Sequence, residues 1–260
     1  MTGGALHLTP LEDFPAVKAG DVLAELIVAA VNRQALRADS SVPVLVVAQK
    51  VVSKAEGRLV YLRDVEVSED ARRLAEEAGK DPRVVELILQ ESQSVIRVRP
   101  GLIITEHRTG HILANAGIDA SNTGVDAASG DDVVLLWPRD PDASARALSE
   151  AVSRGLGYHV PVVINDSLGR PWRMGTVGFA IGVAGLEPVW DQVGERDLDG
   201  RTMQVTAPAM ADALAAAASL VQGETNQGTP VVWAEGCPLR VNEQTSSRAL
   251  LRAGQQDMFR

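Results

Sequence analysis

The sequence predicts an α+β protein whose sheets are mixed and largely antiparallel, with helices flanking them. Predicted strands come in clusters after pairs of helices, instead of the strict alternation that builds a parallel, doubly wound sheet. A hairpin-like stretch, ITEHRTGHIL at residues 104–113, lies in the middle of the chain. The chain has 260 residues, 45% of them hydrophobic, which is enough to bury a substantial core.

Five segments carry the apolar spacing and the end signals of helices. They are residues 20–39, 68–79, 81–92, 141–157 and 207–223. Side chains that cap a first turn, or proline at the first helical position, are expected to begin three of them, and glycine is expected to end the last two. These signals are, in chain order, Asp21, Ser68, Asp81 with Pro82, Gly155 with Gly157, and Gly223.

Nine short apolar runs are typical of strands, because β-branched residues dominate them and polar or glycine-containing segments bound them. They are residues 42–49, 94–98, 101–105, 111–115, 132–137, 160–165, 176–184, 202–206 and 229–235. No repeat with a period of 20–50 residues is visible, which excludes a solenoid or a propeller.

Composition narrows the class of protein. The 25 basic and 34 acidic residues give a net charge of −9, which disfavours nucleic acid as a partner. Cys237 is the only cysteine, so an internal disulfide is impossible and a reducing, cytoplasmic location is expected. We find no leader-like segment, no apolar run of the roughly 18 residues that span a bilayer, and no linker, so residues 1–260 are expected to form one module.

Two apolar runs end in an aspartate. Asp166 and Ser167 follow residues 160–165, and Asp119 lies in the segment ILANAGIDASNTG, residues 112–124. A carboxylate and a hydroxyl at the end of a strand are suited to a hard cation. The first run continues to Arg170 and Arg173, which we expect to clamp an acidic substrate. The alternative is that both segments are ordinary turns capped by Asp and Asn.

Two further segments suggest a phosphate site. Lys50, Lys54 and Arg58 recur every four residues, and a lysine there would act as a point charge on a phosphate. The polar loop VQGETNQGTP, residues 221–230, follows an alanine-rich helix and places Glu224 in a glycine-containing turn. The alternatives are a solvated basic strip and an ordinary helix end. Neither a Walker A motif nor a GxGxxG motif is present.

Other polar and aromatic residues are weaker candidates. His107 and His111 are four residues apart, but Thr109 and Gly110 between them indicate a hairpin turn instead of a helical metal pair. The four tryptophans are expected to anchor a core or an interface. No arrangement of Ser, His and Asp, or of Cys and His, suggests a protein nucleophile.

Together, the motifs SKAEGR, NAGIDASN, DSLGRPWRMGTVGFAIGVAGL and the later Gly-Glu loop resemble the coenzyme F420:L-glutamate ligases, also called F420-0 γ-glutamyl ligases. The similarity extends from LTPLEDFPAVKAGD to TPVVWAEG. It implies an enzyme that uses GTP to join L-glutamate to the carboxylate of a deazaflavin phosphodiester through an acyl phosphate. It also implies Mg or Mn with K, two intimately associated lobes and an intertwined homodimer.

The resemblance assigns roles to residues through these motifs. The implied metal ligands are Asp119, Asp166, Ser167 and Glu224. The implied GTP contacts are Leu11, Glu12, Asp13, Phe14, Gln49, Lys50, Lys54, Asn122, Val221, Gln222, Gly223, Glu224, Thr225, Asn226, Gln227 and Gly228.

Three positions depart from the family pattern. Ala213 follows Asp212 where an acid is common, Thr225 follows Glu224 where glycine is frequent, and Asn165-Asp166-Ser167 replaces Thr-Asp-Thr. These departures leave two alternatives open. One is a ligase of the same fold acting on another acidic cofactor precursor or amino acid. The other is a GTP-binding regulatory protein without catalytic activity.

Overall fold

The computed structural model describes residues 5–38, 41–125 and 129–257. Its centre is a five-stranded sheet in the order β1 (His7–Pro10), β10 (Val231–Glu235), β2 (Val44–Ala48), β8 (Val162–Arg170) and β9 (Arg173–Ala184). β2 and β8 run parallel, and the other neighbouring strands are antiparallel. The predicted α+β class with mixed, largely antiparallel sheets is therefore confirmed.

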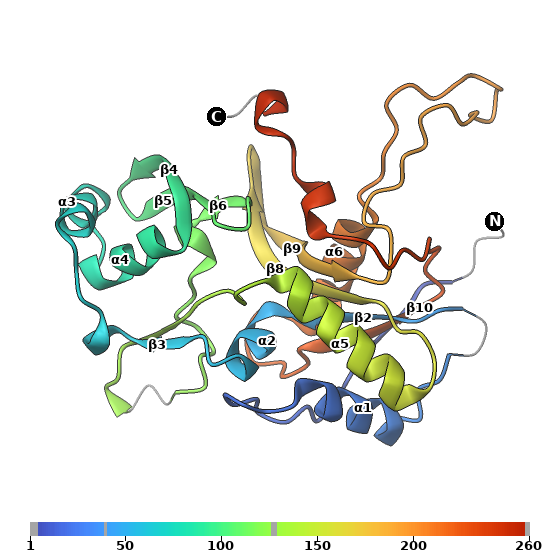
Figure 1. Cartoon of the computed structure of the whole chain (residues 1–260), viewed down its shortest axis with the longest axis horizontal. Coiled ribbons are helices and arrows are strands. Elements are labelled where there is room, and N and C mark those ends of the chain that lie inside the picture. The colour runs from blue at the N-terminus through green and yellow to red at the C-terminus, as the bar shows by residue number, and fades with distance from the viewer. Residues whose placement is uncertain (1–4, 39–40, 126–128, 258–260) are drawn as a thin grey trace.

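Helices cover both faces of this sheet (Figure 1). Side chains alternate along a strand, so Leu45 and Val47 of β2 face one layer and Val44 and Val46 face the other. The first layer contains α1 (Leu23–Arg33) and α5 (Pro141–Leu156), and the second contains α6 (Met210–Gln222). Burial of these two apolar faces, at about 25 cal/mol per Å², holds the central layers together.

Two smaller sheets and two helices lie to one side of the central sheet, at the left of Figure 1. Helices α3 (Glu69–Ala78) and α4 (Pro82–Gln90) pack on a second sheet of β4 (Ser92–Arg99), β5 (Leu102–His107) and β6 (Ile112–Ala114). A third sheet pairs β3 (Leu59–Tyr61) with β7 (Val133–Leu135). Short elements complete the chain: α2 (Gln49–Ala55) and the 3-10 turns Leu62–Asp64, Asn115–Gly117, Ser247–Leu250 and Gly254–Gln256.

The predicted helix signals are confirmed at most positions. Ser68 and Asp81 accept hydrogen bonds from the first turns of α3 and α4, and Gly223 follows α6. The prediction for Asp21 is wrong, because Val22 is the N-cap of α1 and the Asp21 carboxylate accepts a hydrogen bond from Lys18 N instead. Helix α5 continues through Gly155 and ends at Gly157, which adopts φ 83°.

Eight of the nine predicted strands correspond to strands of the structure, and the exception is residues 202–206. That segment makes an isolated bridge between Arg196 and Thr202 and irregular backbone hydrogen bonds to residues 192–195, which do not form a continuous ladder. β1 and β3 were not predicted because they are short and owe their strand conformation to their partners, β10 and β7. Within the described residues, no helix has the length and hydropathy to cross a membrane.

Glycine in β9 lets α6 approach the sheet, and Gly178→Ala is expected to destabilise the protein by about 1–3 kcal/mol. A Cβ at Gly178 would lie 2.4 Å from the backbone oxygen of Ala215 in α6. Gly169→Ala is the matched control, because a Cβ there meets nothing within 4 Å. Urea unfolding of both variants tests this, and equal stability of the two would contradict it.

Candidate functional site

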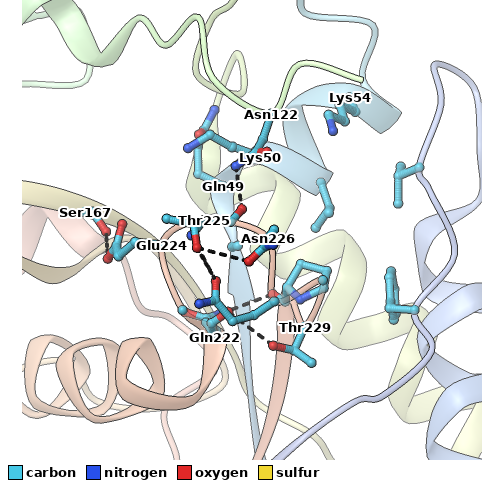
Figure 2. Close-up of a pocket in the computed structure, with 18 of the residues that line it drawn as sticks. Gln49, Lys50, Lys54, Asn122, Ser167, Gln222, Glu224, Thr225, Asn226 and Thr229 are labelled. Atoms are coloured by element: carbon cyan, nitrogen blue, oxygen red, sulfur yellow. Dashed lines mark hydrogen bonds between the residues drawn. The ribbon is translucent and has the colours of Figure 1, made fainter. Parts of the chain in front are cut away.

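A cavity of about 450 Å³ lies where the parallel strands β2 and β8 stop pairing. Open sheets commonly place ligands at the carboxyl ends of their parallel strands. The start of α2, the segment before α1 and the loop after α6 form the other walls (Figure 2). Predicted site residues that line the cavity are Phe14, Gln49, Lys50, Lys54, Asn122, Asp166, Ser167 and the segment from Gln222 to Gly228.

Asp166 lies in the cavity wall with both carboxylate oxygens held. Trp137 Nε1 donates to its Oδ2 at 2.7 Å, and Ser167 N donates to its Oδ1 at 2.8 Å. Burial raises the pKa of Asp166 to about 6, although Lys50 and these two donors act to lower it. The negative charge of Asp119 also raises this pKa, so the two predicted metal ligands influence each other electrostatically.

Ser167 and Glu224 join distant parts of the chain at this cavity. The Ser167 hydroxyl donates to Glu224 Oε1 at 2.5 Å, which connects β8 to the loop after α6 (Figure 2). With Asp166, they form an oxygen-only set of two carboxyl groups and a hydroxyl, the ligand chemistry that suits Mg or Mn. Among the described residues, no three His, Cys, Asp or Glu side chains converge closely enough to hold a metal by themselves.

Asp119 does not line the cavity but lies behind a lysine that does. Lys50 Nζ is 2.6 Å from Asp119 Oδ2. Burial by itself raises the pKa of Asp119, but the Lys50 side chain and Ser121 N outweigh it and lower the pKa. Asp119 therefore orients Lys50 in this structure, and its predicted role as a metal ligand stays a prediction.

Lys54 brings a second ammonium group to the same wall, one helical turn after Lys50 (Figure 2). Burial, and then the positive charge of Lys50, lower the pKa of Lys54. Two cations placed close together at a cavity repel each other. An anionic ligand between them would relieve that repulsion, which is the arrangement expected of a phosphate site.

Hydrogen bonds and a glycine conformation fix the backbone of the loop after α6. Asn122 Nδ2 donates to the carbonyl oxygen of Thr225 at 2.9 Å, and Thr225 N donates to Gln227 Oε1 at 2.9 Å. Gly223 has φ 71°, and a Cβ there would lie 2.3 Å from the Gln227 side chain. Glycine is therefore required at residue 223, whereas Thr225 has no positive φ and does not need to be glycine.

Asn165 is a residue of the site that the sequence interpretation did not assign. Its Nδ2 donates to Gln222 Oε1 at 2.8 Å, and Gln222 Nε2 donates to Asn165 Oδ1 and to the carbonyl of Pro230, each at 3.2 Å. Gln222 is buried, so this exchange of hydrogen bonds mainly joins α6 to the ends of β8 and β10. The signal available in the sequence was the position of Asn165 directly before Asp166.

Seven predicted residues do not line the cavity. Leu11 is buried in the core, and Glu12 and Asp13 lie between it and Phe14, with their carbonyls accepting from Arg33. These three residues therefore position Phe14 in the cavity wall but do not line the cavity themselves. The others outside the lining are Val221, Asp119, Arg170 and Arg173.

Arg170 and Arg173 face each other across the turn of the β8–β9 hairpin. The Arg170 guanidinium donates to the carbonyl of Met174 at 3.3 Å. The strands extend past the cavity before they turn, so the hairpin carries both arginines beyond the described wall. Their predicted action on an acidic substrate stays a prediction.

Arg58, the third residue of the basic strip, belongs to a buried ion cluster. Its guanidinium is 2.8 Å from Glu91 Oε1 and donates to the carbonyl of Trp137 at 2.8 Å. Arg108 Nε lies 3.2 Å from the other Glu91 oxygen, and His107 Nε2 lies 3.5 Å from it. Arg58 therefore joins α4 to the backbone beside Trp137 and does not reach the cavity.

Comparison with known proteins shows the family to which this chain belongs. The family model described as F420-0:Gamma-glutamyl ligase matches residues 13–236. This chain belongs to the F420-0:gamma-glutamyl ligase family. Every residue that lines the cavity falls within the span of the family match, because the lining runs from Phe14 to Pro230.

Several relatives of this chain carry the name coenzyme F420:L-glutamate ligase. The protein from Methanothermobacter thermautotrophicus is 44% identical over 259 residues, which cover 98% of this chain and 99% of the relative. The protein from Methanopyrus kandleri is 44% identical over 258 residues, 98% of each chain. The protein from Archaeoglobus fulgidus is 39% identical over 255 residues, 98% of this chain and 96% of the relative.

Some departures from the ligase family pattern line the cavity and others do not. Ala213 is exposed on α6 and does not line it. Asp212 beside it accepts a hydrogen bond from Ala180 N of β9 at 3.0 Å, which is a structural contact. Thr225 and the segment Asn165-Asp166-Ser167 do line the cavity, so these two departures are the ones that shape the candidate site.

Proposed function

We propose that this chain forms an amide between L-glutamate and the carboxylate of F420-0, using GTP and passing through an acyl phosphate. The observation that supports this most directly is the cavity where Asp166, Ser167 and Glu224 meet the ammonium groups of Lys50 and Lys54. The family and the printed names of its relatives supply the acceptor and the amino acid.

The cavity lining contains both apolar and cationic groups, which suit the two ends of a nucleotide. Phe14, Val17 and Val51 offer apolar surface on which a purine can pack. Lys50 and Lys54 lie where they can contact the phosphate oxygens. Asn122 holds the Thr225 carbonyl and thereby fixes the loop that would close over the nucleotide.

The proposed chemistry needs charge neutralisation more than a protein nucleophile. A carboxylate does not condense with an amine in water, so transfer of the γ-phosphoryl group from GTP first converts the carboxylate to an acyl phosphate and releases GDP. Attack of the glutamate amine on the acyl carbon then forms the amide and releases inorganic phosphate. Phosphoryl transfer is accelerated mainly by positioning and by neutralising charge on the phosphate oxygens. Asp166, Ser167 and Glu224 would hold a divalent Mg or Mn ion, which when bound supplies positive charge at those oxygens. Lys50 and Lys54 would supply further positive charge at the same phosphate oxygens.

The reaction itself is the test. The purified protein is incubated with F420-0, L-glutamate, GTP, Mg or Mn, and K, and the products are identified by mass spectrometry. We expect one GDP for each amide formed, and no product when GTP is omitted. A glutamylated product formed without GTP would reject the GTP-dependent mechanism, and product only with another acceptor or amino acid would favour the substrate alternative.

Thermal unfolding, together with the GDP measurement, distinguishes the proposed ligase from a non-catalytic GTP-binding protein. Such a protein would be stabilised against thermal unfolding by GTP, because ligand binding to the folded state shifts the equilibrium. It would release no GDP in the presence of acceptor, glutamate and metal.

We further propose a homodimer in the cytoplasm, and light scattering of the purified protein tests its oligomeric state.

Lys54→Gln is expected to weaken GTP binding by about tenfold or more, since it removes a charge-assisted contact worth about 1.5–3 kcal/mol. Isothermal titration with GTP measures the change. Lys80→Gln is the control, because Lys80 follows α3 and does not line the cavity. Equal GTP affinity in the two variants would remove Lys54 from the proposed phosphate site.

A further inference from the structure

A second cavity, of about 410 Å³, lies on a different part of the molecule and shares no lining residue with the first. The turn between β5 and β6, the start of α5, one residue of β9 and the 3-10 turn Ser247–Leu250 enclose it. Its lining residues are Arg108, Thr109, Arg139, Asp140, Pro141, Asp142, Arg146, Ile181, Ser246, Ser247 and Arg248.

Four arginines and two aspartates line this cavity, a formal charge of 4 − 2 = +2, and one of the arginines, Arg108, is also paired with Glu91 behind the wall. The protein as a whole carries −9, so the cavity is a local reversal of charge. Within the described part of the chain, the guanidinium groups of Arg139, Arg146 and Arg248 make no hydrogen bond or ion pair. Their donors are therefore available to a ligand.

Within the described residues, the two aspartates form no ion pair with these arginines, and their oxygens accept from backbone and hydroxyl donors instead. Asp142 Oδ1 accepts from Val183 N and Ser247 N, each at 2.9 Å. Its Oδ2 accepts from the hydroxyls of Ser246 at 2.6 Å and Ser247 at 3.2 Å. Asp140 caps α5 by accepting from Ala143 N at 2.9 Å.

These contacts also fix the walls of the cavity. Asp142 joins the start of α5 to β9 and to the segment that carries Arg248. Glu56 accepts hydrogen bonds from Arg139 N, at 3.1 Å, and from the Ser144 hydroxyl. Arg139 and Arg146 therefore project from a backbone that is held by these contacts, so ligand binding would order their exposed side chains but not the backbone.

We propose that this arginine cavity binds a small phosphate-bearing anion. Guanidinium groups contact phosphate oxygens in pairs, and a phosphate offers enough oxygens and charge for several of them at once. A single carboxylate has two oxygens and one negative charge, which is too little for the three guanidinium groups of Arg139, Arg146 and Arg248. The volume of about 410 Å³ suits a small molecule and not a protein segment.

The test is isothermal titration of the protein with inorganic pyrophosphate and with inorganic phosphate. The double variant Arg146→Gln/Arg248→Gln is expected to bind at least tenfold more weakly than wild type, because two charge-assisted contacts are lost. Arg154→Gln is the matched control: it lies on α5, like Arg146, but outside the cavity lining. Pyrophosphate bound in the first cavity would be retained by all three proteins, so it cannot produce this difference.

A second variant separates the arginine fork from charge alone. Arg146→Lys/Arg248→Lys keeps both charges and loses the planar fork, so its affinity is expected to fall between wild type and the Gln variant. Thermal unfolding of each variant shows that it is folded. Equal affinity of wild type and the Gln double variant for both anions, or no binding of either anion by wild type, overturns the proposal.

The two anions also identify the source of the phosphate. Pyrophosphate that binds at least tenfold more tightly than phosphate indicates an extended diphosphate-containing metabolite. Equal affinities indicate inorganic phosphate itself. Both outcomes support the arginine cavity as a phosphate site.

Discussion

Asp166→Asn is expected to lower the rate of amide formation by about a hundredfold to a thousandfold, the usual cost of removing one preorganised electrostatic group from a site. The change keeps the volume and removes the negative charge that lines the cavity. Trp137 Nε1 and Ser167 N both donate to this side chain, and an amide has only one oxygen to accept from them. One donor is therefore left unsatisfied, at about 1–3 kcal/mol.

Turnover at saturating substrate concentrations and urea unfolding are measured together, so that lost activity is not confused with lost structure. Asp212→Asn is the matched control. Burial raises the pKa of Asp212 too, but among the described residues its carboxylate accepts from Ala180 N alone, and an amide oxygen can still accept that bond. We expect turnover close to wild type for this control. A folded Asp166→Asn protein with normal turnover would exclude Asp166 from the chemistry.

Glu91→Ala is expected to destabilise the protein by about 3–5 kcal/mol, because it leaves buried cations without their counter-charge. Only 9% of the Glu91 side chain is exposed, and 10% of Arg58. Arg58 also donates to the Trp137 carbonyl, so the loss reaches the residue that holds Asp166. Urea unfolding at neutral pH measures the change in free energy.

The contribution of Glu91 should also depend on pH. Burial by itself raises the pKa of Glu91, but His107 and the two arginines outweigh it and lower the pKa to about 2, from an ordinary value of 4.5. The unfolded chain therefore takes up a proton at this group before the folded protein does. The difference in stability between wild type and Glu91→Ala is expected to be constant above pH 4.5 and to shrink as the pH falls toward about 2.

The control for this cluster is an exposed ion pair. Arg73 and Asp70 lie 2.8 Å apart on α3 with more than three quarters of each side chain exposed. Asp70→Ala is expected to cost less than about 1 kcal/mol. If Glu91→Ala cost no more than this variant, or if its deficit did not change in acid, the buried cluster would have no special role in stability.

Much of the fold was predictable because its signals are local. Ser68 and Asp81 cap helices through bonds to residues two or three positions away, so the sequence alone contains both partners. The apolar runs of β2, β8 and β10 are buried on both faces, which makes them continuous and easy to recognise. Residues 202–206 are short and more polar, and they pair only irregularly with residues 192–196.

The site was predictable in part because its motifs occur at the ends of such runs. Asp119, Asp166, Ser167 and Glu224 were predicted to act together, and the structure brings the last three to one cavity while Asp119 pairs with Lys50 outside its lining. Asn165 and Trp137 were not assigned to the site. Their contribution comes from hydrogen bonds to residues 57 and 29 positions away, which no local pattern records.

The basic strip of Lys50, Lys54 and Arg58 shows what the sequence determined and what only the tertiary structure decided. The sequence alone determined that Lys50, Lys54 and Arg58 carry charge at helical spacing, and that the chain has the motifs of the F420-0:gamma-glutamyl ligase family. The tertiary structure decided which of the three reach the cavity. Helix α2 ends at Ala55, so Arg58 leaves the helical face and turns toward Glu91, 33 residues later in the chain. A charge acts on whatever the folded chain places beside it, and spacing along the sequence does not contain that distance.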